Sequence, residues 1–296
     1  MKLAVVVLNW NAIEDTERCI LAVQDWSASR LGGRPTLWVV DNGSQQPGID
    51  VLIDRYPSVH FLRNPVNQGY AAANNRGIVS ALDSGTDAML LLNNDAHLDE
   101  ASVVSMLATL VSQPRIGVVG PILRDGDQLL AAGGRDIARY NMTHLRPTHP
   151  PTQLLDVDYV PGTVALVSQQ VFETVGLLDE EYFFSGEMAD FCYRARQRGF
   201  RCVTDPEARA SHDLARSARA RDTLHIYYIF RNRFLYIRKN HPGRKAWYYT
   251  LWTLRAAQAA MTAVARGDVR RARTIGLSVL DGLSGRFGGQ NDRVLA

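Results

Sequence analysis

The 296-residue chain has only three cysteines, Cys19, Cys192 and Cys202, and they are scattered along the sequence. Their odd number and lack of metal-ligand spacing predict neither a disulfide framework nor a structural metal site, so a reducing compartment is the simpler expectation. The N-terminal apolar run at residues 3–8 is short and lacks the small-residue cleavage site of a signal peptide. We therefore interpret it as a buried first strand and expect a cytoplasmic protein.

Three phosphate or nucleophile motifs are also missing. The sequence contains no Walker loop, no G-x-G-x-x-G after the first apolar run and no G-x-S-x-G elbow. These absences argue against P-loop enzymes, Rossmann dehydrogenases and α/β-hydrolases. A nucleotidyltransferase of similar topology would need a glycine-rich phosphate loop after the first strand, where this chain has Asn9-Trp10-Asn11.

Charge is distributed unevenly. Residues 1–190 contain 12 Lys and Arg against 23 Asp and Glu, whereas residues 191–296 contain 21 against 7. A basic C-terminal third predicts a polyanionic neighbour, such as anionic phospholipid or a phosphorylated lipid acceptor, or an Arg-rich solvated face that pairs with the acidic part. Nucleic acid is the weakest candidate partner, because these Arg residues are spread over helices that also carry much apolar surface.

Short apolar runs alternate with amphipathic stretches over the first 120 residues. We expect strands at residues 3–8, 36–40, 59–62, 88–92 and 116–119, and helices at 14–26, 67–82 and 102–112. This alternation predicts an α/β fold with a mostly parallel central sheet flanked by helices. Ligands of such sheets bind at the carboxyl ends of the strands, where this sequence places its polar clusters.

The rest of the chain is less regular. Glycines and prolines in residues 121–157 predict an irregular insertion, either a mobile loop or a small hairpin. Strands are expected at 157–160 and 164–167, and a helix at 169–175 that ends at Gly176. A helical tail follows from residue 222, and its second helix, at about 245–266, is aromatic but carries Arg255 and Gln258. Those polar residues argue against a transmembrane span and leave an interfacial helix or a helix packed on the catalytic domain.

Two aspartates end apolar strands. Asp41 precedes Asn42-Gly43-Ser44 and suits either hydrogen bonding to a nucleotide base or a local turn. Asp95 ends the run Leu91-Leu92-Asn93-Asn94-Asp95. A carboxylate with amide neighbours suits Mg²⁺ or Mn²⁺ together with substrate phosphates, although a turn has the same composition.

Two further groups of side chains carry candidate chemistry. Glu187 and Asp190 lie three residues apart, so a helix that begins near Gly186 puts both carboxylates on one face of its first turn. They suit a general base or helix capping. His212 is a candidate ligand, and the arginines after it, Arg216 among them, suit pyrophosphate binding or a solvated loop.

Together these segments resemble family 2 glycosyltransferases of GT-A fold, and most closely the bacterial rhamnosyltransferase-like members. The resemblance covers about residues 3–240 and rests on five segments that occur in order: residues 6–11, 39–44, 67–75, 91–95, and 187–194 followed by His212. It implies a catalytic domain at residues 1–221 and a C-terminal helical extension at 222–296.

The resemblance also implies roles for individual residues. Asp41 would bind the nucleotide base, and Asp95 would be the last residue of the DxD-type metal motif, written here Asn-Asn-Asp. His212 matches the histidine that completes the metal site in some members. The nucleotide-sugar pocket would be lined by further residues from the matching segments and the arginine loop: Leu8, Asn9, Asn67, Gly69, Asn74, Asn94 and Arg216.

One departure concerns the base. Relatives commonly have Glu-Asp-x-Asp where this chain has Glu187-Met188-Ala189-Asp190, and methionine cannot accept a proton. The base would then be Glu187 or Asp190; we favour Glu187 and expect Asp190 to orient the helix or an arginine. The alternative is a catalytically weak or inactive protein of the same fold that binds a nucleotide-sugar or glycan.

The resulting prediction is an inverting, Mg²⁺- or Mn²⁺-dependent transferase. Its donor would be dTDP-rhamnose or a UDP-hexose, and its acceptor a lipid-linked or cell-envelope glycan. The basic tail suggests contact with the inner face of the cell membrane. No pattern in the sequence indicates an oligomeric state.

Overall fold

The computed structural model describes residues 1–212 and 220–295. Its centre is a sheet that includes four adjacent parallel strands and in which β9 runs antiparallel to both neighbours. The order across the sheet is β3 (His60–Asn64), β2 (Thr36–Asn42), β1 (Leu3–Asn9), β4 (Ala88–Asn93), β9 (Val164–Ser168), β6 (Ile116–Asp125), β10 (Arg201–His212) and β5 (Ala96–Leu98). β7 (Gln128–Ala131) pairs with β6, and β8 (Leu155–Asp156) pairs with β10. The expected α/β architecture is confirmed.

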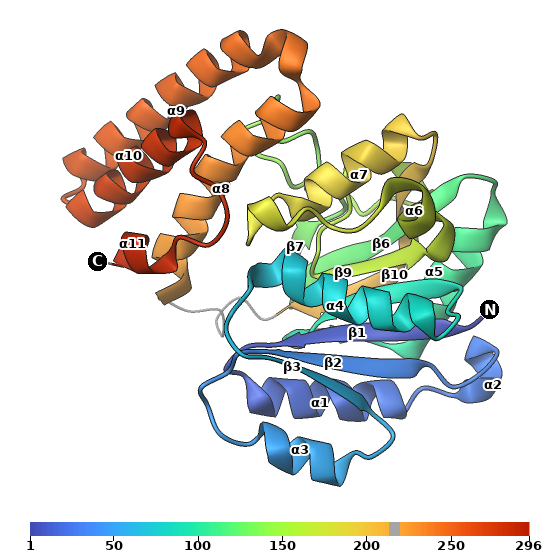
Figure 1. Cartoon of the computed structure of the whole chain (residues 1–296). Helices are drawn as coiled ribbons and strands as arrows, with labels where there is room; N and C mark the ends of the chain where they lie inside the picture. Colours follow the sequence, from blue (N-terminus) through green and yellow to red (C-terminus); the bar gives the residue numbers. More distant parts are fainter. Residues whose placement is uncertain (213–219, 296) are drawn as a thin grey trace.

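Helices cover both faces of the sheet (Figure 1). The side chains of β1 alternate between the faces, so Val5 and Val7 pack in one core and Ala4 and Val6 in the other. The first core contains α1 (Ile13–Gln24), α3 (Ile49–Arg55) and α5 (Glu100–Ser112). The second contains α4 (Gly69–Asp83), α6 (Gln169–Val175) and α7 (Glu187–Gln197). The short helix α2 (Ala28–Leu31) follows α1.

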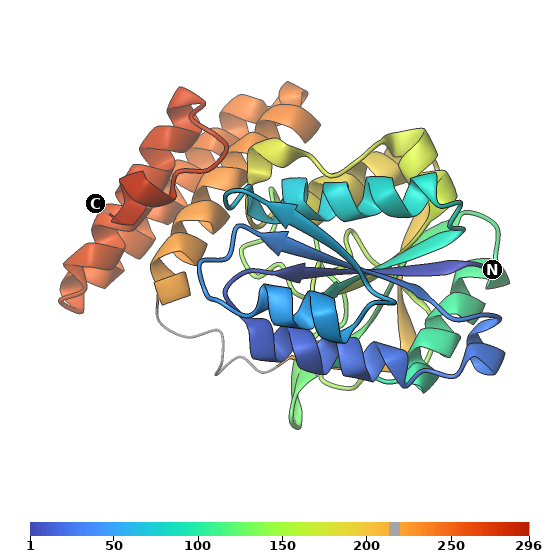
Figure 2. The same ribbon diagram turned by 60° about the horizontal axis from the view of Figure 1, so that its bottom comes forward.

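The C-terminal helices are α8 (Ala220–Asn240), α9 (Lys245–Ala265), α10 (Val269–Ser284) and α11 (Asn291–Leu295). They form a block toward which the arrowheads of the blue strands β1 to β3 point (Figure 2). Phe234 of α8 belongs to the same core as α7, and the indole N–H of Trp252 donates to the Ala138 carbonyl at 2.8 Å. In the part of the chain that the structure describes, no helix is long and apolar enough to cross a membrane.

The structure lacks the strand expected at 157–160, contains the small hairpin that was one alternative for residues 121–157, and has a further strand, β10, that was not expected. The strand expected at 157–160 is absent, because Val157, Tyr159 and Val160 are buried in irregular backbone and only Leu155–Asp156 pair as β8. The first part of residues 121–157 is regular, because β6 extends to Asp125 and forms a small hairpin with β7. β10 was not foreseen, because Pro206 interrupts its apolar pattern at a register shift between Thr204 and Arg209.

Candidate active site

A cavity of about 150 Å³ lies at the carboxyl ends of β1, β2 and β4. One wall comes from these strand ends and the start of α4, and the other from the segment before α7 together with α8 and α11. The lining residues are Leu8, Trp10, Asn42, Asn67, Gly69, Tyr70, Asn93, Asn94, Asp95, Phe183, Phe184, Leu224, Tyr228 and Asn291. The C-terminal helices therefore complete a pocket that the sheet alone leaves open.

Five of the residues predicted from the sequence line this cavity: Leu8, Asn67, Gly69, Asn94 and Asp95. The other predicted nucleotide-binding residues that the structure describes are buried behind its wall: Asn9, Asp41 and Asn74. Arg216 lies outside the described residues.

Asp41 is held by a buried polar network. The Asn9 amide donates to Asp41 Oδ1 at 2.8 Å, and the Thr16 hydroxyl donates to Asn9 Oδ1 at 2.8 Å. A buried carboxylate with fixed donors keeps one orientation. The base-binding role of Asp41 stays a prediction, but its oxygens have the fixed placement that such a role requires.

Asn42 is a lining residue absent from the predicted set. Its amide donates to Asn67 Oδ1 at 2.9 Å, and its Oδ1 accepts from Asn64 at 3.0 Å and from the Gln68 backbone N–H at 3.0 Å. The side chain thus links the end of β2 to the turn that starts α4. Its position directly after Asp41, at the carboxyl end of a parallel strand, was the available sequence signal.

Asp95 and His212 come together although 117 positions separate them in the sequence. The antiparallel pairing of β10 with β5 puts His212 opposite Ala96, and His212 Nε2 lies 3.2 Å from Asp95 Oδ2. No group of three or more Asp, Glu, His or Cys side chains within residues 1–212 and 220–295 is arranged to hold a metal. One carboxylate and one imidazole still fit a divalent cation that completes its shell with phosphate oxygens and water.

Glu187 is the first residue of α7 and its side chain is buried. The pKa of its carboxyl is raised to about 7, mainly by burial and to a smaller extent by the charge of Asp190, while the backbone N–H groups of Glu187, Met188 and Ser185 oppose the rise. Among the described residues, its Oε2 has no hydrogen-bond partner. A carboxyl that titrates near neutrality and keeps one oxygen available suits proton transfer.

Asp190 is engaged differently. Its Oδ2 accepts from Arg194 Nε at 2.7 Å, and its Oδ1 accepts from Asn240 at 2.8 Å and from the Tyr182 hydroxyl at 3.3 Å. This carboxylate is only 1% exposed and fixes α7 to its surroundings. Its geometry supports the expectation that Asp190 orients an arginine.

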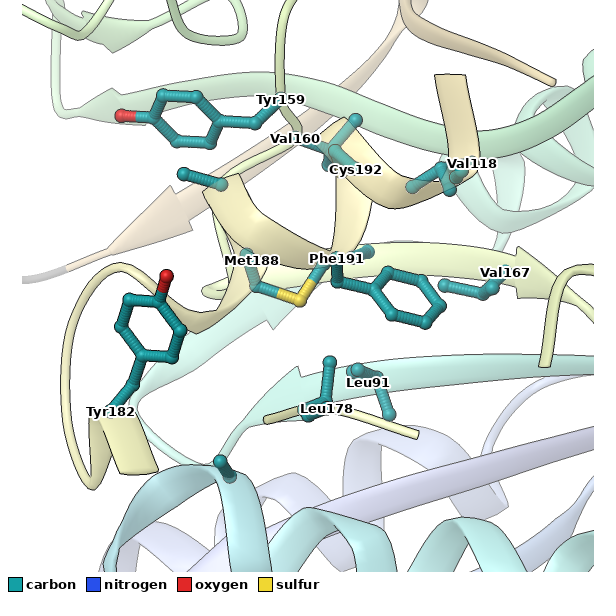
Figure 3. Packing of buried hydrophobic residues seen from close by; sticks show 14 of the residues in the cluster. Leu91, Val118, Tyr159, Val160, Val167, Leu178, Tyr182, Met188, Phe191 and Cys192 are labelled. Atoms are coloured by element: carbon teal, nitrogen blue, oxygen red, sulfur yellow. The ribbon is translucent and has the colours of Figure 1, made fainter. Parts of the chain in front are cut away.

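Met188 lies in the core rather than in the cavity. It is 2% exposed and packs in the cluster that contains Phe191, Leu91 and Leu178. Figure 3 shows Met188 and Phe191 on the side of α7 that faces Leu91 and Leu178. The residue that replaces the acidic side chain of the relatives therefore serves packing.

Tyr70 connects the two groups of acidic residues. Its hydroxyl donates to the Gly162 carbonyl at 2.6 Å. Burial raises the pKa of this hydroxyl, and the charges of Glu187 and Asp95 raise it further. The charges of both carboxylates therefore act on this side chain, which itself lines the cavity.

Comparison with known proteins agrees with this fold. The sequence model described as "Glycosyl transferase family 2" matches residues 4–176. The N-acetylglucosaminyl-diphospho-decaprenol L-rhamnosyltransferase of Mycobacterium tuberculosis is 26% identical, over 86% of this chain and 92% of its own length.

Two solved structures share the fold. The mannosyltransferase PcManGT of Pyrobaculum calidifontis, in complex with GDP-Man and Mn²⁺, is 13% identical with a TM-score of 0.62, over 96% of this chain and 88% of that one. GalNAc-T7 with UDP, GalNAc and Mn²⁺ is 16% identical with a TM-score of 0.58; the match covers 72% of this chain but only 44% of the GalNAc-T7 chain.

The family match and the fold identify a nucleotide-sugar-dependent transferase of GT-A fold. The chain belongs to glycosyl transferase family 2.

Proposed function

We propose that this enzyme transfers a sugar, with inversion, from dTDP-rhamnose or a UDP-hexose to a hydroxyl of a lipid-linked or cell-envelope glycan. The observation that supports the proposal is a cavity lined by Asp95, which pairs with His212, and by Tyr70, whose hydroxyl is affected by the charge of the buried Glu187 carboxyl. The rhamnosyltransferase activity named for the mycobacterial relative supports the choice of donor and of a lipid-linked acceptor.

Glu187 acts as the general base in this proposal. Its carboxylate takes the proton of the acceptor hydroxyl while that oxygen attacks the anomeric carbon and the bond to the nucleoside diphosphate breaks. Asp95 and His212 would hold a divalent cation, Mg²⁺ or Mn²⁺, and that cation would supply positive charge to offset the charge of the leaving nucleoside diphosphate. The apolar walls around Phe183 and Phe184 limit the access of water to the donor.

Both parts of the chain contribute to the same cavity. We propose residues 1–221 as the catalytic domain and residues 222–296 as an extension. Leu224, Tyr228 and Asn291 of this extension line the pocket. The extension therefore belongs to the site and is more than a helical appendage.

A thermal-shift panel tests donor binding. We would measure the unfolding midpoint with dTDP-rhamnose, UDP-glucose and UDP-galactose, each with and without Mn²⁺, for wild type, Asp95→Ala and the exposed control Asp127→Ala. Ligands that bind the native state raise the midpoint. We expect a Mn²⁺-dependent rise for one donor that Asp127→Ala keeps and Asp95→Ala loses. No rise with any donor would contradict the proposal.

A second candidate function is binding of a nucleotide-sugar without transfer, which the replacement by Met188 favours. Release of nucleoside diphosphate distinguishes the two functions. Saturable donor binding without any release, to water or to a lipid-linked glycan, would support the binding protein.

We also propose that the extension touches an anionic membrane surface from the cytoplasmic side. Trp247, Leu254 and Met261 recur every seven residues along α9 and are 68%, 64% and 66% exposed. Exposed Arg244 and Lys245 lie at the start of this helix. An apolar stripe next to cations fits the interface of anionic phospholipid.

Vesicle sedimentation tests this contact. We expect binding to phosphatidylglycerol vesicles but not to phosphatidylcholine vesicles, and loss of binding in Trp247→Ser/Leu254→Ser. Leu21→Ser, an exposed apolar position on α1, should bind as wild type does. Equal binding to both lipids, or unchanged binding of the double variant, would contradict the contact.

A further inference from the structure

The segment that leads into α7 has an unusual backbone. Phe183 has φ 59°, Ser185 φ 68° and Gly186 φ 99°, and Glu187 follows directly. Two non-glycine residues with positive φ within three positions are costly, and such a conformation persists only when its surroundings fix it. We call residues 183–186 the base loop.

Asn232 of α8 provides much of that support. Its side-chain amide lies 2.9 Å from the carbonyl oxygen of Tyr182, 2.8 Å from that of Phe184 and 2.5 Å from that of Ser185. The Asn232 side chain is only 1% exposed, so its amide is buried against the base loop. One amide from the C-terminal extension, with two N–H donors, thus lies within hydrogen-bond distance of three carbonyl oxygens in and beside the base loop.

Arg231 holds Asn232 in turn. Its Nε and Nη2 donate to Asn232 Oδ1 at 2.9 Å and 2.7 Å, Nη2 also donates to the Tyr182 carbonyl at 3.2 Å, and Nη1 donates to the Gly288 carbonyl at 2.5 Å. The guanidinium is fully buried, and the rings of Tyr227, Tyr228 and Phe287 lie against it. Burial of a cation is costly unless its N–H donors are paired with acceptors. The need to keep these hydrogen bonds fixes the position of the Arg231 guanidinium.

The donor side of the cavity contacts the base loop from the other direction. The Tyr70 backbone N–H donates to the Phe183 carbonyl at 2.5 Å. A Cβ on Gly69 would lie 2.4 Å from that same carbonyl oxygen. The base loop is therefore clamped between the start of α4, which lines the donor pocket, and the Arg231–Asn232 pair of the extension.

We propose that Arg231 and Asn232 are positioning residues that hold the base loop and thereby set the burial and direction of the Glu187 carboxyl. This inference rests on the proposed function, in which Glu187 is the base. The link is direct, because the Ser185 backbone N–H contacts that carboxyl and the Ser185 carbonyl accepts from Asn232. The titratable groups that face Glu187 are Asp190 of α7, Tyr70 of α4 and Tyr159.

The test titrates Glu187 without any turnover. The difference in unfolding midpoint between wild type and Glu187→Gln, followed from pH 4 to pH 9, reports the ionisation of this carboxyl in the native state. We expect its inflection at about 7. In an Asn232→Ala background, the inflection should move toward the value of a solvated glutamate, about 4.3.

Asn75→Ala is the matched control. Asn75 is a buried asparagine whose amide also donates to a backbone carbonyl, that of Leu178 at 2.9 Å, outside the base loop. Asn75→Ala should lower the free energy of unfolding about as much as Asn232→Ala does, and it should leave the pH at which Glu187 titrates unchanged. If Asn232→Ala does not fold, Arg231→Lys, which keeps the charge but loses the planar fork, should still lower the inflection.

The inference would be overturned if the pH at which Glu187 titrates stayed the same in Asn232→Ala, or in Arg231→Lys where that variant replaces it. It would also be overturned if this pH moved as far in Asn75→Ala. Failure of the proposed function is a separate observation. It would appear as unchanged donor turnover in Glu187→Gln, whatever the titration shows.

Discussion

The two walls of the cavity are built in different ways. On the strand side, Asn42 ends β2 and bonds to Asn67 in the turn before α4, while Asp95 follows β4 and pairs with His212 at the end of β10. On the opposite side, the base loop is supported by Arg231 and Asn232, about 50 positions further along the chain. The strand wall depends on the ends of sheet strands and the turns beside them, whereas the loop wall depends on the extension. Substitutions should therefore separate donor binding from proton transfer.

The largest effect is expected for Asp95→Ala. Removal of the carboxylate deprives the cation and the donor diphosphate of their anchor, so we expect a loss of turnover of roughly 10³-fold. Donor-dependent stabilisation should disappear with it. Initial rates of nucleoside diphosphate release over a Mn²⁺ series measure this effect; a rate within tenfold of wild type would remove Asp95 from the site.

Glu187→Gln should affect the other wall alone. We expect turnover to fall by about 10²-fold, while the midpoint shift caused by donor and Mn²⁺ is kept. Parallel assays of release and of thermal shift separate the two effects. Loss of donor binding as well would show that the walls are not separable.

The same substitution has a pH-dependent effect on stability. The native pKa of Glu187 lies above its unfolded value, so its favourable contribution is complete at low pH and is lost as the pH rises through about 7. Above that pH the buried carboxylate destabilises the fold, by up to roughly 3 kcal/mol. Glu187→Gln should therefore be more stable than wild type at pH 8.5 in urea unfolding; lower stability there would contradict the raised pKa.

Gly69→Ala should perturb both walls. Gly69 has φ +87°, and an added Cβ would lie 2.4 Å from the Phe183 carbonyl oxygen. We expect a loss of roughly 2 kcal/mol in stability together with weaker donor binding. Gly85→Ala also has positive φ but meets nothing within 4 Å, so it provides the control for backbone strain alone. Equal effects of both substitutions would mean that the contact with the base loop is unimportant.

The smallest effect is expected for Tyr228→Phe. The Tyr228 hydroxyl donates to Asn291 Oδ1 at 2.7 Å and accepts from the Gln290 backbone N–H at 2.9 Å. Its removal should cost about 1 kcal/mol of stability and leave donor binding unchanged. Urea unfolding checks the first statement and donor thermal shift the second. A loss of donor affinity in Tyr228→Phe would show that the extension contributes to donor binding.

The sequence predicted the strand side well for a physical reason. A buried strand has a short apolar run, and the residues that follow it must lie at the edge of the sheet, so Asn94 and Asp95 could be placed from their neighbours in the chain, whereas Leu8 was implied by the family resemblance. The pairing of Asp95 with His212 needed the family resemblance, because β10 is interrupted at Pro206 and gives no clear strand pattern.

The support of the loop wall could hardly be predicted from the sequence. Nothing local to Arg231-Asn232 distinguishes a buried positioning pair from the polar face of an amphipathic helix. Their role appears only when α8 packs against the carbonyls of the base loop. Similarly, Asn291 lines the cavity from a short helix that the sequence did not reveal.

A crystal structure with dTDP and Mn²⁺ tests the central claim most directly, through the anomalous scattering of the metal. The account predicts one strong anomalous peak in contact with Asp95 Oδ2, His212 Nε2 and the diphosphate, with the Glu187 carboxyl facing the same cavity. A nucleotide bound elsewhere, or a metal that contacts neither Asp95 nor His212, would contradict it.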